Sequence, residues 1–126
     1  MSAVKRIISL LFASALLFSI IGCSASEREY HEDIVIALQD PSEKIIIREW
    51  QYLLGSGADV YYQKGNADAV LLGKTTGADD GFCPFKEGLY ELIQNGDEIT
   101  VRWCFSPSDS KDIWRYGSFS IPAPNN

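Results

Sequence analysis

Cysteine and histidine are the side chains of this chain best suited to chemistry, and both are scarce. The 126 residues include three cysteines and one histidine. Cys83 lies in the stretch Gly-Phe-Cys-Pro-Phe at residues 81–85 with Lys86 next to it, and a nearby cation can lower a thiol pKa and make the thiolate a nucleophile. His31 lies in a polar stretch, which predicts a solvated residue outside the folded part. Without a folded histidine, Ser–His–Asp and Cys–His schemes and most metal sites are excluded, so we expect no catalysis, no cofactor and no metal, with a hydrolase that uses Cys83 as the alternative.

Adjacent carboxylates form a second candidate. Asp79 and Asp80 lie between glycines in the loop 75–81, where carboxylate and carbonyl oxygens could bind Ca²⁺. The loop lacks the spaced acidic ligands of an EF-hand, so a solvated turn is the simpler interpretation. Loops positioned by a rigid sheet often carry binding residues. We therefore predict Asp79 and Asp80 as a binding loop without an assigned ion.

Aromatic side chains are the third candidate. Tyr61 and Tyr62 are adjacent on a predicted strand, so their side chains must point to opposite faces of the sheet. One of the two is expected to be exposed, where it could bind a glycan or a peptide. Trp50 and Trp103 are instead expected in the core.

The N-terminal stretch determines where these residues are expected to work. Lys5 and Arg6 precede an uncharged run at residues 7–21, which ends in Ile-Ile-Gly-Cys at residues 20–23. A basic N-terminal region, a short apolar run and a small residue before the cleavage site are typical of a secretory signal peptide. The run is shorter than the about 20 residues that span a bilayer.

Cys23 makes this segment resemble the signal peptide and lipobox of bacterial lipoproteins. The resemblance covers residues 1–23, and the remaining chain is not assigned to any family. It implies cleavage after Gly22, a lipid thioether on Cys23, and attachment to the extracytoplasmic side of the cell membrane, or to the outer membrane of a diderm cell. A plain secretory signal and an uncleaved anchor are the alternatives.

The expected mature chain is acidic. Without Lys5 and Arg6 it has nine basic and 17 acidic residues, a net charge of about −8. This charge argues against nucleic acid as a partner and against the protein body lying on anionic lipid. It favours a cationic protein or envelope ligand, or it keeps the domain soluble.

Cys83 and Cys104 are the two cysteines left after acylation of Cys23. Thiols in an oxidising compartment often pair, so a disulfide between them is one expectation. The alternative is that both stay free, because Cys104 lies near the end of a predicted strand and Cys83 lies just before Pro84, where the partner strand should end.

Short apolar segments separated by turns predict an all-β fold. Strands are expected at 34–38, 44–50, 59–63, 68–72 and 112–121, with turns that include 55–57 and 64–67. About seven strands fit a small antiparallel sandwich or barrel. The predicted organisation is a signal peptide (1–22), a lipidated tether (23–32), a β domain (33–121) and a disordered tail (122–126).

A hairpin at residues 89–105 is the most specific structural prediction. Asn95-Gly96 suits the two positive-φ positions of a type I′ turn between alternating runs. With these two as the loop, Gln94 faces Asp97 and Leu92 faces Ile99, and one face of the pair is apolar.

These observations predict a membrane-anchored extracytoplasmic lipoprotein that acts as a non-catalytic binding module. Its ligand is not identified by any residue pattern. One alternative is a proteinaceous inhibitor of a cationic envelope hydrolase such as lysozyme, which rests on architecture and charge. The other is an accessory subunit of a cell-envelope complex.

Overall fold

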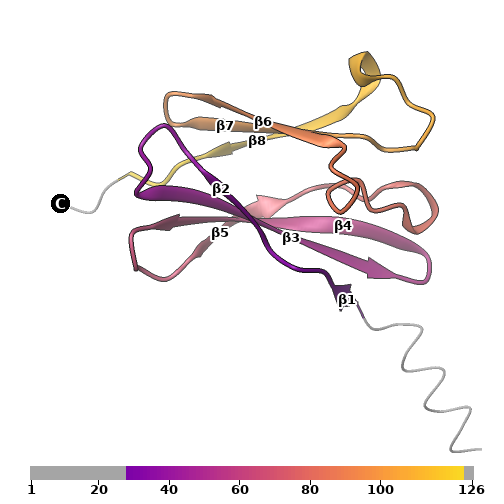
Figure 1. The fold of residues 1–126 in the computed structure, drawn as a ribbon, viewed down its shortest axis with the longest axis horizontal. Coiled ribbons are helices and arrows are strands. Elements are labelled where there is room, and N and C mark those ends of the chain that lie inside the picture. Colours follow the sequence, from indigo (N-terminus) through magenta and orange to yellow (C-terminus); the bar gives the residue numbers. More distant parts are fainter. Residues whose placement is uncertain (1–27, 124–126) are drawn as a thin grey trace, which may run out of the picture.

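The chain folds into two antiparallel β-sheets that pack face to face (Figure 1). The computed structural model describes residues 28–123, so the predicted signal peptide and Cys23 lie outside the described residues. The five-stranded sheet contains β1 (Glu29–Tyr30), β2 (Ile34–Ala37), β3 (Glu43–Tyr52), β4 (Gly55–Lys64) and β5 (Val70–Lys74). The three-stranded sheet contains β6 (Tyr90–Asn95), β7 (Glu98–Trp103) and β8 (Arg115–Ser120). The predicted small all-β sandwich is confirmed, with eight strands where about seven were expected.

Helical structure in this part of the chain is limited to two short 3-10 turns. They are η1 (Asp79–Gly81) and η2 (Lys111–Ile113). Within residues 28–123, no helix has the length and apolar character needed to cross a membrane.

Strand β3 is the centre of the larger sheet, as its run of three isoleucines predicts. It pairs with β4 along its whole length and with β1 and β2 on its other side. Ile45 and Ile47 point between the sheets and are fully buried, whereas Ile46 between them points to the opposite face. β-branched side chains on both faces are typical of such an interior strand.

The core lies between the two sheets and draws on both. Its buried members are Leu38, Ile45, Ile47, Ala58, Val60, Tyr62, Phe85, Ile99, Val101 and Trp103. Phe85 comes from the long connection between β5 and β6, and its ring lies 5.3 Å from that of Tyr90 and 6.4 Å from that of Trp103. This connection is therefore part of the core and not a peripheral loop.

The predicted turn at 55–57 is wrong, because these residues begin β4. Gly57 lies opposite Trp50, whose indole ring occupies the space above it: a Cβ on Gly57 would lie 2.4 Å from Trp50 Cζ2. The glycine is needed for this close approach and not for a turn. The chain turns instead at Leu53 and Leu54, and β3 continues to Tyr52. Trp50 is buried, but on the face away from the core.

The hairpin of β6 and β7 exists, but its predicted register is wrong. Asn95 pairs with Glu98, so the two loop residues are Gly96 and Asp97, and Leu92 faces Val101. Gly96 takes the positive φ of 62°, which the first loop position requires. Because the shift is two residues, the apolar face predicted for the hairpin still points to the core.

The predicted start of the β domain differs from the structure. The predicted tether at 23–32 overlaps β1, in which Tyr30 pairs with Trp50 of β3. The folded part therefore begins before residue 33. At the other end β8 stops at Ser120, and Pro122 and Ala123 of the predicted tail are exposed. Residues 124–126 lie outside the described residues.

Candidate functional site

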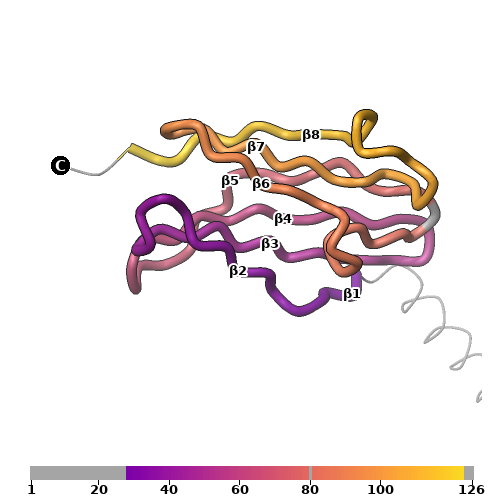
Figure 2. Tube along the Cα trace, turned by 45° about the horizontal axis from the view of Figure 1, so that its top comes forward, coloured from indigo at the N-terminus to yellow at the C-terminus, as the bar shows by residue number. Residues whose placement is uncertain are grey.

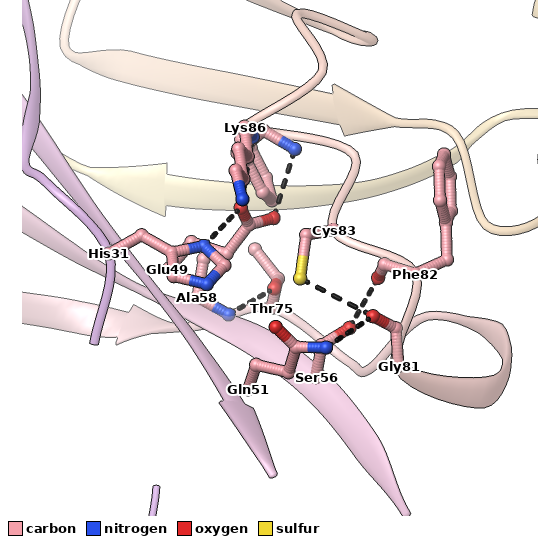
Figure 3. Close-up of polar contacts among 11 residues, drawn as sticks. His31, Glu49, Gln51, Ser56, Ala58, Thr75, Gly81, Phe82, Cys83 and Lys86 are labelled. Atoms are coloured by element: carbon pink, nitrogen blue, oxygen red, sulfur yellow. Dashed lines mark hydrogen bonds and ion pairs between the residues drawn. The ribbon is translucent and has the colours of Figure 1, made fainter. Parts of the chain in front are cut away.

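A buried carboxylate at one end of the sandwich is the centre of the candidate site. Glu49 lies on β3 on the same face as Ile45 and Ile47, and only 1% of its surface is exposed. Its Oε2 accepts a hydrogen bond from the backbone N–H of Phe85 (2.9 Å), and its Oε1 accepts one from that of Lys86 (2.9 Å) (Figure 3). A buried charge is tolerated only when it is well paired, and these two amides supply that pairing.

His31 completes the environment of Glu49. Its backbone N–H donates to the carbonyl oxygen of Glu49 (2.8 Å), and its Nδ1 lies 3.3 Å from Glu49 Oε1. The expectation that His31 is a solvated tether residue is therefore wrong. The segment between β1 and β2 folds against β3 and places the imidazole over the carboxylate.

Cys83 reaches the same cluster from the connection between β5 and β6. The nitrogen, oxygen and sulfur donor atoms of His31, Glu49 and Cys83 all lie within 4.8 Å of one another. This donor set is one that Zn²⁺ uses, but here each group already has a protein partner: the thiol contacts the carbonyl oxygen of Gly81 (3.4 Å), and the carboxylate accepts two backbone hydrogen bonds and lies 3.3 Å from His31 Nδ1. The cluster is thus built as a hydrogen-bonded network.

The thiol of Cys83 has the opposite character to an activated nucleophile. Burial, and then the negative charge of Glu49, raise the pKa of Cys83 to about 11. The cation of Lys86 lowers this pKa, as the sequence suggested, but it is outweighed. At neutral pH the group is therefore a protonated thiol, which is a poor nucleophile.

A hollow of about 400 Å³ opens beside Glu49. It is lined by His31, Glu32, Asp33, Ile34, Glu49, Phe85 and Lys86. Three carboxylates face one lysine, so the lining has a net negative charge when the histidine is neutral. Ile34 and Phe85 give the hollow an apolar side. We call this feature the Glu49 pocket.

The pocket is held by contacts of the β5–β6 connection with the last residues of β3 and the first residues of β4. Thr75 Oγ1 accepts a hydrogen bond from the backbone N–H of Ala58 (3.0 Å), and Ser56 Oγ donates to the carbonyl oxygen of Phe82 (2.5 Å). Gln51 Nε2 donates to the carbonyl oxygen of Gly81 (3.2 Å). These contacts fix the path of the backbone up to Phe85 and Lys86, whose N–H groups donate hydrogen bonds to Glu49.

The cysteine pair is not joined. Cys83 and Cys104 are both free and buried, and they contact different backbone carbonyl oxygens, those of Gly81 and of Ser106. Cys104 follows β7 directly, as its predicted place at a strand end requires.

The predicted binding loop lies apart from the Glu49 pocket lining. Asp79 and Asp80 belong to η1, and Asp79 is exposed. The backbone N–H of Asp79 donates to the carbonyl oxygen of Phe105 (3.0 Å), which ties the loop to the chain after β7.

The adjacent tyrosines point to opposite faces of the five-stranded sheet. Tyr62 is 7% exposed in the core, and its hydroxyl donates to Glu43 Oε1 (3.0 Å). Tyr61 lies on the solvent face, where the guanidinium of Arg48 is 5.3 Å from its ring centre. Neither tyrosine lines the Glu49 pocket.

Sequence patterns missed the pocket because its residues come from distant segments that look unremarkable. One signal for Glu49 was present: it follows Ile45 and Ile47 at the spacing of two that places all three on one face of a strand. No comparable signal marks His31.

We predict that Glu49→Gln destabilises the fold by about 1–3 kcal/mol, because an amide has one oxygen acceptor and its NH₂ group would face a backbone N–H. The measurement is urea unfolding followed by circular dichroism. Glu98→Gln, an exposed carboxylate on β7, is the matched control and should change stability by less than about 0.5 kcal/mol. Equal effects of the two substitutions would contradict the role given to Glu49.

We also predict that both thiols resist alkylation at pH 7 in the folded protein and react once urea unfolds it. Since the folded pKa of Cys83 is raised, its thiolate fraction and reaction rate should keep increasing as the pH approaches about 11. Mass spectrometry of alkylated protein gives both rates. A Cys83 rate that levels off below pH 8.5 would contradict this environment, and an absence of adducts in urea without reductant would show a disulfide.

Comparison with known proteins identifies no relative of this chain. No family model matches the chain, and no curated protein and no solved structure is significantly similar to it. The functional inferences below therefore rest on the residues and contacts of this chain.

Proposed function

We propose that this protein is a lipid-anchored extracytoplasmic binding protein without catalytic activity, and that its Glu49 pocket accepts a cationic group of a partner. The anchor rests on the resemblance of residues 1–23 to a lipoprotein signal and lipobox. The binding role rests on one observation, the excess of carboxylates in the pocket lining.

The three carboxylates of the pocket differ in how firmly hydrogen bonds hold them. Glu49 is fixed by backbone amides, and Asp33 is held by Arg48 through two hydrogen bonds of 2.8 and 3.0 Å. Glu32 is exposed at the rim. A lysine or arginine side chain that enters would lie along Ile34 and Phe85, with its charge close to Glu32 and Glu49.

Non-catalytic binding agrees with the chemistry of the cluster. The raised pKa of Cys83 keeps its sulfur protonated, and Glu49 is occupied by two backbone N–H donors and the neighbouring His31. A reaction would need one of these groups to be released first. A pre-organised acidic hollow needs no such change to bind a cation.

A cationic envelope hydrolase such as lysozyme is the partner class that the charge favours. The whole chain has a net charge of −6, and removal of Lys5 and Arg6 makes it more negative. Complementary charge speeds association and selects against acidic partners. An inhibitor of this kind would place the pocket over a basic side chain of the enzyme.

We predict that the full-length protein binds lysozyme and that the affinity falls as salt is raised. Glu32→Gln should weaken binding about two- to fivefold, because it removes one exposed charge from the rim. Calorimetry or surface plasmon resonance measures this change, and Glu98→Gln on the other sheet is the control.

Two results would argue against this partner. Absence of binding at micromolar protein would exclude lysozyme, and an equal loss for Glu32→Gln and Glu98→Gln would show that net charge acts without the pocket. The anchor is tested separately by the mass of Cys23 in membrane extracts.

A further inference from the structure

The solvent face of the five-stranded sheet carries a row of apolar side chains; we call it the outer face. Strand register places Val35, Ile46, Tyr61 and Leu71 in one row across β2, β3, β4 and β5. Val35 is 58% exposed and Leu71 is 47% exposed. The solvent face of the three-stranded sheet has two large apolar side chains, Ile93 and Tyr116, and is otherwise polar, with Glu91, Asn95, Glu98, Thr100, Arg102, Ser118 and Ser120.

The outer face also carries an excess of positive charge, in a chain whose net charge is −6. The guanidinium of Arg28 lies 4.1 Å from the ring centre of Trp50, and that of Arg48 lies over Tyr61. The register adds Lys44, opposite Ala37 and Gln63, and Lys74, opposite Asp59. The carboxylates on this side, Asp33 and Asp59, are bonded to Arg48 and to the Trp50 indole N–H.

One corner of the outer face ends in an exposed apolar turn. Leu53 and Leu54 connect β3 to β4 and are 73% and 81% exposed, more than any other large hydrophobic side chain in residues 28–123. Tyr52 precedes the turn. Tyr30 lies opposite Trp50 on β1, so the chain enters the domain beside this turn, as Figures 1 and 2 both show. We call Arg28, Tyr30, Tyr52, Leu53 and Leu54 the anchor-side corner.

We propose that the anchor-side corner is a second membrane contact, in which Leu53 and Leu54 insert below the headgroups of an anionic bilayer. This inference rests on the proposed lipid anchor. Arg28 follows Cys23 by five residues, which span at most about 17 Å, so an acylated Cys23 holds the corner close to the headgroups.

The residue types at the corner match the layers of a bilayer. Leucine is favourable among acyl chains, tyrosine is favoured at the interface, and arginine is attracted to anionic lipid. Burial of each leucine strengthens membrane association about tenfold or more. The acidic remainder of the chain would stay away from the same surface, which orients the domain. The prediction that the protein body avoids anionic lipid then applies to the other faces.

The direct test uses the full-length lipidated protein in vesicles of phosphatidylcholine and phosphatidylglycerol. One variant carries Leu54→p-benzoylphenylalanine, and its matched control carries the same photoreactive residue at Ile93, which is 49% exposed on the three-stranded sheet. After illumination, mass spectrometry identifies the adducts. We expect lipid adducts from position 54 and none from position 93.

A second measurement, the rate of transfer between vesicles, tests the membrane contact without the photoreactive residue. Leu53→Ser with Leu54→Ser should speed transfer of the lipidated protein between vesicles about 100-fold. Ile93→Ser with Ile113→Ser, two exposed positions outside the corner, should leave the transfer rate unchanged.

The outcomes separate the corner from the anchor. If Cys23 is acylated but position 54 gives no lipid adduct, or positions 54 and 93 give equal adducts, the proposed membrane contact of the corner is wrong and the lipid anchor stands. If position 54 instead forms adducts with a second copy of the chain or with another protein, the corner is a protein interface and the proposed membrane contact is wrong. An unacylated Cys23 overturns the anchor and, with it, this inference.

Discussion

The buried carboxylate of Glu49 is the interaction on which one end of the sandwich depends. A charged group with 1% exposure is costly unless hydrogen bonds replace water, and the amides of Phe85 and Lys86 do so. Those amides belong to the connection that leads from one sheet to the other. The same carboxylate holds His31, so the strand connection and the entry segment both depend on one side chain of β3.

Strand β3 separates two surfaces at this end of the molecule. Glu49 points between the sheets toward the pocket, and Trp50, the next residue, points to the outer face beneath Arg28. Alternation along a strand therefore gives the domain a polar, acidic side and an aromatic, basic side. Under the proposed lipid anchor, the aromatic, basic side would face the bilayer and the acidic side would remain free for a partner.

The sequence predicted the strands better than their contacts. Runs such as 45–47 identify an interior strand because β-branched residues on both faces have few other stable places. The β6–β7 loop was misplaced by one position because both Asn95-Gly96 and Gly96-Asp97 suit a tight hairpin, and local sequence does not choose between them. The turn at 55–57 was misread because glycine also permits close packing, here under Trp50.

The site was harder to predict than the fold, because hydrogen bonds between distant segments create it. His31 looks like part of a polar tether until β1 pairs with β3, and the partners of Glu49 are backbone amides, which any residue type supplies. Residue patterns identify side-chain chemistry and not backbone donors. The alternation of Ile45, Ile47 and Glu49 was the available signal, and it indicates burial without indicating the partner.

Amide hydrogen exchange of Phe85 and Lys86 tests the role of Glu49 most directly. In the wild-type protein both amides should exchange slowly, although Lys86 itself is exposed. In the Glu49→Gln variant, which keeps one oxygen acceptor, at least one of them should lose protection while the amide of Val101 in β7 keeps its own. Fast exchange of both amides in the wild-type protein would contradict the account, as would unchanged protection in the variant.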